Sequence, residues 1–241
     1  MKHALVLGAS GDIGIATVTQ LAAEGWSLYL HYNHQKEKIT QLITKLSTQF
    51  PTQDFLGVSF DMSTLDHLHE FLGNIFELDT IIFVQGTTSY KLLTETTSEE
   101  ILHQWNMQVA VPIEMIKALQ DKLARSSHGR IIFVGSVYGA VGSAMEVSYS
   151  TVKGAQSAFA NAYAKEVGSL GITVNVVAPG AVDTHMNHFL TSDDRQSITE
   201  DIPAGKFATP ADIAYWIVQL TNQAAGYMTG QTIYIDGGWL K

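Results

Sequence analysis

Tyr149 and Lys153 lie four residues apart and are the pair in this sequence best suited to proton transfer. On a helix this spacing places both side chains on one face. A phenol ionises near pH ~10 in water, and an adjacent ammonium favours the phenolate, which brings the phenol pKa toward the range that a general acid needs. Ser136 lies thirteen residues before the tyrosine, and its hydroxyl could hold a carbonyl oxygen while Tyr149 delivers a proton.

The residues around Ser136 predict how this set is positioned. Residues 131–134 form a short β-branched and aromatic run typical of a strand buried on both faces, and Gly135 ends it. Ser136 therefore lies at the carboxyl end of a strand, where open α/β sheets bind ligands. The pair alone is weak evidence, because Tyr32 and Lys36 repeat its spacing without such a setting. The alternative is a solvated helical lysine beside a half-buried tyrosine.

The composition restricts the class of protein. The 241 residues are 46% hydrophobic, which is enough for one substantial core. The net charge of −9 argues against a nucleic-acid partner, because phosphate binding favours a basic surface. No cysteine is present, so disulfides and thiol chemistry are excluded. Residues 4–7 are too short for a signal peptide and no run approaches the ~20 apolar residues of a membrane span, so we expect a cytoplasmic protein without a membrane partner.

A glycine-rich turn at residues 8–14 follows the first predicted strand and leads into a helix, an arrangement that directs backbone N–H groups at a phosphate. The second strand, residues 27–32, ends without the acidic residue that would bind the ribose of NAD. It continues instead into His34 and Lys36, which favours NADP. The alternative is that both side chains are merely solvated.

Helices and strands alternate along the rest of the chain. Helices are predicted at 36–49, 65–76, from 97–98, at 106–124, at 152–167 and from 209, and strands at 55–60, 80–84, 172–177 and 232–235. This order predicts a doubly wound, Rossmann-type α/β fold of about seven mostly parallel strands with helices on both faces. Residues 181–205 are polar with little periodicity, which suggests a mobile substrate lid at about 184–205 within a single domain, 1–241.

Several polar residues outside the central stretch are candidates for binding. Asn106 is surrounded by apolar residues, and a buried amide needs partners. Asp61 ends the third strand and could accept from an adenine amine or cap the following segment. His67 with His69, and His185 with His188, are potential metal ligands, but His67 and His69 face different sides of a helix and no cysteine assists. We therefore expect no metal.

Taken in this order, the motifs resemble those of the short-chain dehydrogenase/reductase family, and within it most those of bacterial 3-oxoacyl-[acyl-carrier-protein] reductases. The likeness runs from Gly8 to residues 227–238 and includes residues 172–180. The resemblance implies an NADPH-dependent enzyme that reduces a 3-oxoacyl-thioester-like ketone as a homotetramer. It assigns Tyr149 as general acid, Lys153 to lower its pKa and bind the nicotinamide ribose, Ser136 to orient the carbonyl, and Asn106 to hold a water that leads protons to Lys153.

The resemblance also implies cofactor contacts from the glycine turn, the strand ends and the segment before the lid. They are Gly8, Ser10, Gly11, Asp12, Ile13, Gly14, Tyr32, Asn33, Asp61, Met62, Gly86, Tyr149, Lys153, Pro179, Gly180, Val182 and Thr184.

Two motifs depart from the family pattern. Asp12 replaces the middle glycine of the turn, where an acid repels phosphates unless its side chain turns away, and residues 83–86 have Phe-Val-Gln-Gly in place of Asn-Asn-Ala-Gly.

A third departure concerns the substrate. Carrier-protein reductases of this type commonly place Arg at the positions of Ser127 and Leu170, and without these charges an acidic carrier is harder to attract. Arg125, Arg130 and Lys165 lie nearby and could substitute. The sequence therefore leaves open a second substrate, the 5-aminopentanone adduct on elongation factor P, because residues 26–33 resemble reductases of that group. A non-catalytic NADP-binding sensor is the alternative of another class.

Overall fold

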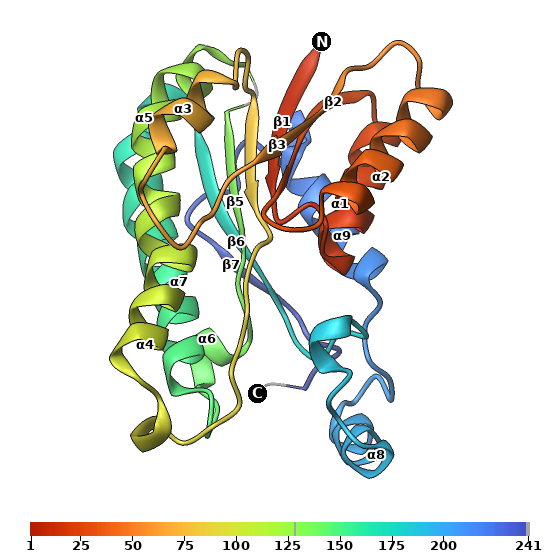
Figure 1. Cartoon of the computed structure of the whole chain (residues 1–241), viewed down its shortest axis with the longest axis vertical. Coiled ribbons are helices and arrows are strands. Elements are labelled where there is room, and N and C mark those ends of the chain that lie inside the picture. Colours follow the sequence, from red (N-terminus) through yellow and green to blue (C-terminus); the bar gives the residue numbers. More distant parts are fainter. Residues whose placement is uncertain (128, 240–241) are drawn as a thin grey trace.

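The computed structural model describes residues 1–127 and 129–239, so residues 128, 240 and 241 of the predicted domain, 1–241, lie outside the described part. A sheet of seven strands forms the centre of the protein, in the order β3-β2-β1-β4-β5-β6-β7 (Figure 1). All neighbouring strands are parallel, which confirms the predicted doubly wound fold. The strands are β1 (Lys2–Leu7), β2 (Trp26–Tyr32), β3 (Phe55–Ser59), β4 (Thr80–Phe83), β5 (Arg130–Val134), β6 (Thr173–Pro179) and β7 (Thr232–Ile235).

Helices cover both faces of the sheet (Figure 1). On one face lie α3 (Leu68–Gly73), α4 (Ser98–Trp105), α5 (Val111–Arg125) and α7 (Val147–Val167), and on the other α1 (Asp12–Ala23), α2 (Lys36–Gln49) and α9 (Pro210–Thr221). Each layer buries its own apolar cluster, as a helix stripe and a sheet face must be removed from water together. The strands β1, β4 and β5 contribute to both clusters, which explains why they are almost continuously apolar.

Local signals in the sequence place several helix starts correctly. Thr97 and Thr209 each cap a helix, and each accepts a hydrogen bond from the third residue of that helix. Two predicted helices differ from the structure. The helix expected at 65–76 is only α3, because His67 adopts a left-handed backbone with φ 61° just before it. The helix expected at 106–124 is divided into a π-helix, η2 (Asn106–Ala110), and α5.

The segment predicted as a mobile substrate lid contains regular structure. It holds a short helical turn, η4 (His185–Asn187), and the ten-residue helix α8 (Ser192–Asp201). Thr191 caps α8 in a reciprocal pair with Asp194, and Arg195 forms an ion pair of 2.9 Å with Asp183. The sequence gives little sign of this helix, because a mostly exposed polar helix has little hydrophobic periodicity.

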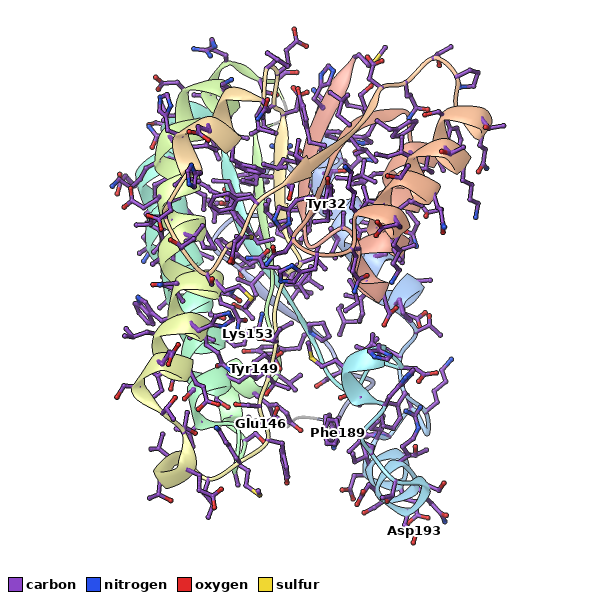
Figure 2. The ribbon with its side chains drawn as sticks, in the orientation of Figure 1. Tyr32, Glu146, Tyr149, Lys153, Phe189 and Asp193 are labelled. Carbon is purple, nitrogen blue, oxygen red and sulfur yellow. The ribbon has the colours of Figure 1, made fainter. Side chains whose placement is uncertain are left out.

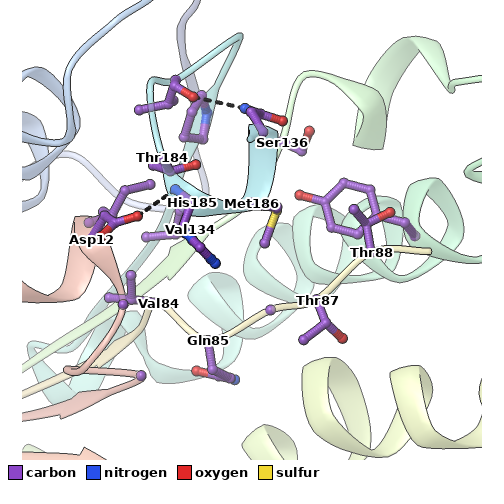
Figure 3. Close-up of a pocket in the computed structure, with 18 of the residues that line it drawn as sticks. Asp12, Val84, Gln85, Thr87, Thr88, Val134, Ser136, Thr184, His185 and Met186 are labelled. Atoms are coloured by element: carbon purple, nitrogen blue, oxygen red, sulfur yellow. Dashed lines mark hydrogen bonds between the residues drawn. The ribbon is translucent and has the colours of Figure 1, made fainter. Parts of the chain in front are cut away.

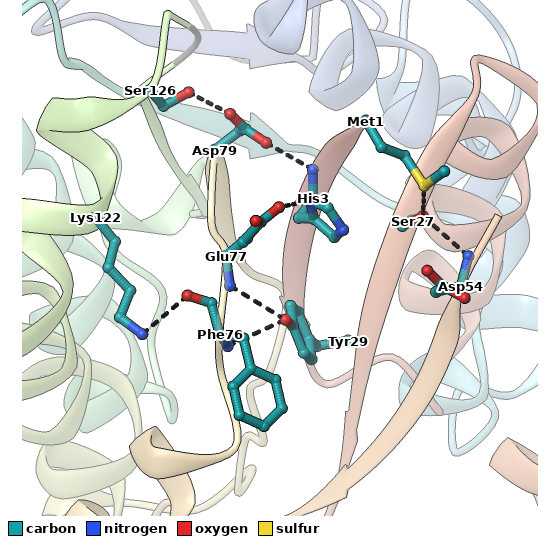
Figure 4. Close-up of polar contacts among 10 residues, drawn as sticks. All are labelled: Met1, His3, Ser27, Tyr29, Asp54, Phe76, Glu77, Asp79, Lys122 and Ser126. Atoms are coloured by element: carbon teal, nitrogen blue, oxygen red, sulfur yellow. Dashed lines mark hydrogen bonds and ion pairs between the residues drawn. The ribbon is translucent and has the colours of Figure 1, made fainter.

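Polar contacts tie together the amino ends of the strands (Figure 4). Asp79 accepts hydrogen bonds from the backbone of His3, at 2.7 Å, and from the hydroxyl of Ser126. The Tyr29 hydroxyl accepts from the backbone N–H of Phe76 at 3.1 Å. Hydrogen bonds among the protein's own polar groups therefore hold the amino end of the sheet, whereas a cavity lies at the carboxyl end. No helix in the described part of the chain combines the length and apolar character of a bilayer span.

Candidate active site

A cavity of about 1060 Å³ lies at the carboxyl ends of the strands. The strand order changes direction between β1 and β4, which is where open α/β sheets bind their ligands. Every predicted cofactor-contact residue lines this cavity, from Gly8 in the turn to Thr184 before the lid. Ser136, Tyr149 and Lys153 line it as well, whereas Asn106 does not.

Tyr149 and Ser136 face each other within the cavity. Ser136 follows β5, and its oxygen accepts a hydrogen bond of 3.1 Å from the backbone of Tyr138, which leaves its own proton for the Tyr149 oxygen. Burial raises the pKa of Tyr149 to about 12, a hydrogen bond with Ser136 lowers it, and the charge of Glu146 raises it. The net shift of the Tyr149 pKa is upward, so the lowered pKa expected from the neighbouring lysine is not reached. The phenol therefore keeps its proton at neutral pH, as a proton donor must.

Lys153 lies one helical turn from Tyr149, with its Nζ 5.5 Å from the centre of the phenol ring (Figure 2). The side chain is 3% exposed, and burial lowers its pKa to about 7. Its Nζ donates to the backbone oxygen of Val134 at 2.8 Å and to Gln156 at 3.3 Å. The ammonium is thus bound to the end of β5 and to its own helix, and not to the phenol oxygen.

Gln108, and not Asn106, is the amide of η2 (Asn106–Ala110) that lies on the same side as Lys153. The Asn106 amide is directed away from Lys153 and donates to the backbone oxygen of Ser63 at 2.9 Å. Gln108 is fully buried, and a methyl group placed on Gly86 would lie 3.3 Å from its Oε1 and 3.6 Å from the Lys153 Nζ. Asn106 and Gln108 both belong to the π-helix η2. The extra residue per turn of a π-helix changes which side chains face inward. A helix period of 3.6 cannot predict this.

The glycine turn is built for close backbone approach. Gly8 has φ +78°, and a Cβ there would lie 2.7 Å from the backbone nitrogen of Gln85. A Cβ on Gly14 would lie 2.2 Å from the oxygen of Gly8. His31, which we did not predict as a site residue, supports this turn: its Nδ1 accepts from the N–H of Gly8 at 3.0 Å and its Nε2 donates to Phe60 at 2.9 Å. Burial lowers the pKa of His31 to about 4, so the ring is neutral and carries no charge for a phosphate.

Asp12, the acid in the glycine turn, points toward the lid. Its carboxylate accepts a hydrogen bond of 2.7 Å from the backbone N–H of His185 in η4 (Figure 3). It is also the first residue of α1, where the helix dipole favours a negative charge. The carboxylate is therefore bound to the lid, and no capping side chain occupies the backbone N–H groups at the start of the helix, so these groups can still meet a phosphate.

The segment after β2 and the start of α2 carry basic side chains on the cavity wall. His34 and Lys38 line the cavity, whereas Lys36, which the sequence favoured, does not. The difference arises because α2 begins at Lys36, and its rotation turns the side chain two residues later toward the cavity. Across the cavity Asp61 accepts from the backbone of Ser63 at 2.8 Å, so it caps a turn while still lining the wall. These groups fit a nucleotide with an additional phosphate.

Glu146 lines the cavity near Tyr149, and sequence reasoning missed it. It precedes α7, and Glu146, Tyr149 and Lys153 follow one another along this side of the cavity, with Phe189 of the lid on the other side (Figure 2). The carboxylate accepts from Thr88 at 2.7 Å and from Ser143 at 3.0 Å. Among the described residues it forms no ion pair with a basic side chain. The sequence signal that could have identified Glu146 is its position three residues before Tyr149.

In the part of the chain that the structure describes, no three His, Asp or Glu side chains come together as potential metal ligands. His67 is bonded to Glu70 at 3.2 Å, and the rings of His185 and His188 pack against each other with centres 4.8 Å apart. These clusters are therefore explained by local contacts.

Comparison with known proteins agrees with this geometry. A family model described as enoyl-(acyl carrier protein) reductase matches residues 8–240. The chain is 36% identical over 239 residues to the uncharacterized oxidoreductase YmfI of Bacillus subtilis, covering 99% of this chain and 98% of that protein. It is 32% identical over 250 residues to the 3-oxoacyl-[acyl-carrier-protein] reductase FabG of Escherichia coli, covering 98% and 96%. The solved structure of the angucycline C-6 ketoreductase LanV with bound NADP superposes with a TM-score of 0.92 at 25% identity, covering 99% and 95%. The chain therefore belongs to the short-chain dehydrogenase/reductase family of oxidoreductases.

Proposed function

We propose that the protein reduces a ketone to a secondary alcohol with NADPH, and that Tyr149 is the general acid. The observation that carries this proposal is a protonated phenol, hydrogen-bonded to Ser136, on the wall of the cavity that the glycine turn also lines. The relatives named as reductases, and the ketoreductase with bound NADP, support the same reaction.

The residues of the chain divide the reaction between them. NADPH, when bound, supplies the hydride that adds to the carbonyl carbon. Ser136 orients the carbonyl by a hydrogen bond to its oxygen, and the Tyr149 O–H gives its proton to that oxygen as the alcohol forms. The Lys153 ammonium stabilises the phenolate that remains and binds the ribose hydroxyls. The backbone N–H groups at the start of α1 hold the pyrophosphate.

The direct test is the oxidation of NADPH by purified protein, followed at 340 nm with acetoacetyl thioesters, diketones and an aminopentanone-bearing protein. Turnover well above background with one of these carbonyls is expected. Tight binding of NADPH without turnover on a broad carbonyl panel would instead favour the non-catalytic sensor.

Lys38 is expected to select NADPH over NADH. An exposed ammonium at the edge of the cavity can pair with the 2′-phosphate, and such pairs contribute up to about 1 kcal/mol. Lys38→Ala should therefore raise the Kd for NADPH about three- to fivefold, with little change for NADH. Fluorescence titration with both cofactors measures this. Lys45→Ala, on the same helix but outside the cavity, is the control, and equal losses in both variants would contradict the assignment.

The charges near the expected docking positions bear on which carrier presents the substrate. A thioester on acyl carrier protein is the family expectation, but Leu170 replaces one docking Arg and Arg130 is only 3% exposed, so Arg130 cannot serve as a substitute. Arg125 and Lys165 are exposed and could still meet an acidic carrier. Charge attraction to such a carrier is therefore reduced but not absent.

Glu146 favours the second candidate substrate, the aminopentanone adduct on elongation factor P. A half-buried carboxylate without a basic partner, close to the proposed acid, is suited to bind an amine on the substrate. Such a contact orients a ketone whose other end is positively charged. A neutral β-keto thioester has no group that would use it.

Glu146→Gln is expected to raise the KM for an amine-bearing ketone about tenfold and to leave the KM of a neutral ketone of equal length nearly unchanged. Steady-state kinetics with the two ketones measure the difference. Asp193→Asn removes a charge from the outer end of α8, outside the cavity, and serves as control (Figure 2). Parallel changes for both ketones would rule out an amine contact at Glu146.

We also propose that residues 184–205 close over the substrate and that the protein is a homotetramer. Phe189 of the lid contacts Tyr90, with ring centres 6.0 Å apart, which supports closure of residues 184–205 over a substrate. Exposed apolar side chains on α4, including Leu102 and Trp105, support association of α4 with further copies in a homotetramer. The cytoplasmic location expected from the sequence also stays a prediction.

A further inference from the structure

Lys153, which lines the cavity, meets two buried amide side chains behind the cavity wall. Lys153 and Gln156 lie on α7 and are 3% and 2% exposed, and Gln108 lies on the π-helix η2 and is 0% exposed. An ammonium and two amides buried together require that each donor faces an acceptor.

The direction of the Gln156 amide follows from its partners. Its Nε2 donates to the backbone oxygen of Gln108 at 2.8 Å, and a carbonyl oxygen can only accept. Its Oε1 is therefore turned toward the Lys153 Nζ, 3.3 Å away. Reversing the amide would place NH₂ against the ammonium and oxygen against oxygen, which is unfavourable at both ends. The main chain of η2 thus sets the orientation in which Gln156 accepts from the lysine.

The remaining surroundings of the ammonium supply dipoles and no negative charge. Val134 at the end of β5 offers a carbonyl oxygen at 2.8 Å, and the Gln108 Oε1, which has no hydrogen-bond partner among the described residues, borders the same space beside Gly86. Tyr149 is the titratable group that faces the ammonium from α7. No carboxylate of the described part forms an ion pair with Lys153.

We propose that Gln156 is a positioning residue for Lys153. The amide oxygen of Gln156 holds the lysine ammonium one turn from Tyr149 and favours the protonated form of the lysine. The inference rests on the proposed reductase function, in which that ammonium acts on the phenol. Burial alone disfavours the charge, as the lowered pKa of Lys153 reflects. Each acceptor aimed at the ammonium opposes this effect, so removing one should make the lysine lose its proton at lower pH.

Two substitutions of similar size test this with opposite expected signs. Gln156→Leu removes the acceptor, and the pKa of Lys153 should fall by about one unit. Gln156→Glu places a carboxylate at the same position, and the pKa should rise by about one unit or more. The lysine is observed directly by carbon NMR of protein with labelled lysine ε-carbons, and its signal is assigned by its loss in Lys153→Met. This measurement does not depend on activity.

The pH dependence of kcat/KM for ketone reduction provides the second readout. Its alkaline limb should move with the NMR titration, to lower pH in Gln156→Leu and to higher pH in Gln156→Glu. A purely structural role would lower Tm in both variants and would not move the limb in opposite directions. Unchanged Lys153 titration in both variants, or shifts of the same sign, would overturn the proposal.

The two proposals can fail separately. Opposite NMR shifts in a protein that reduces no carbonyl would support Gln156 as the residue that positions the lysine and reject the reductase. Active variants whose lysine titrates as in the wild type would support the reductase and reject Gln156 as the residue that positions the lysine. Should Gln156→Leu not fold, Gln156→Asn, which withdraws the amide oxygen by one methylene, replaces it with the same expected direction.

Discussion

Tyr149→Phe is expected to lower kcat for NADPH-dependent ketone reduction by about a thousandfold, within the range attributed to a positioned proton donor. The substitution removes only the hydroxyl that faces Ser136, so the ring still fills its place on α7. The Kd for NADPH should change by less than about twofold, because the backbone groups of the glycine turn are not affected. Stopped-flow measurement of the hydride-transfer step and a fluorescence titration of NADPH test both expectations.

The pH dependence gives the same experiment a second readout. Since burial keeps the pKa of Tyr149 at about 12, the phenol is protonated throughout the neutral range and its ionisation should not limit the rate below about pH 9. Tyr163→Phe is the matched control, because Tyr163 lies on the same helix outside the cavity and is bonded to Gln120. A Tyr149→Phe enzyme with more than about a tenth of the wild-type kcat would exclude the phenol as the acid.

Lys153→Met is expected to produce a protein that is more stable than the wild type and at least about a hundredfold less active. The wild-type lysine is almost fully buried with a pKa of about 7, well below the usual value of 10.5, so folding removes a proton or buries a charge. The corresponding cost is on the order of several kcal/mol, and methionine fills a similar volume without it. The loss of activity follows because the ammonium no longer stabilises the phenolate.

The stability gain should depend on pH in a predictable direction. The unfolded lysine holds its proton up to about pH 10.5, whereas the folded one releases it near pH 7, so the unfolded state binds more protons in between. The wild type should therefore gain stability as pH rises from about 7 to 10.5, and the advantage of Lys153→Met should shrink over that window. Urea unfolding at several pH values measures this. Lys165→Met, exposed on the same helix, is the control, and a constant difference between Lys153→Met and wild type would refute the linkage.

The fold could be predicted well because its signals are local. The helix at residues 36–49 was predicted with the observed bounds, and Thr97 and Thr209 cap helices as their neighbours indicate. Buried strands such as β1 and β5 are apolar in sequence because both of their faces meet helices. Capping and periodicity act over a few residues, so they are visible before the chain folds.

The site could be predicted only in part. The chemistry of Ser136, Tyr149 and Lys153 follows from residue type and spacing, and the carboxyl ends of parallel strands bring such residues into one cavity. The buried amide was misplaced at Asn106, because a π-helix has no signature in hydrophobic periodicity and turns Gln108 inward instead. Glu146 also could not be predicted. Its role depends on having no basic partner among the described residues, and this is decided by segments that are distant in the sequence.

Residue types and their order along this chain were sufficient to establish a wound parallel sheet, a nucleotide-binding turn and a tyrosine with a lysine one turn away. The protonation states and the partners of these residues were decided by tertiary structure. Burial raises the pKa of Tyr149 and lowers that of Lys153, opposite to what the pair would do in water, and it leaves the His31 ring neutral against the Gly8 backbone. The physical reason is that a pKa depends on how much water and how many dipoles surround a group, and both are properties of the packed protein.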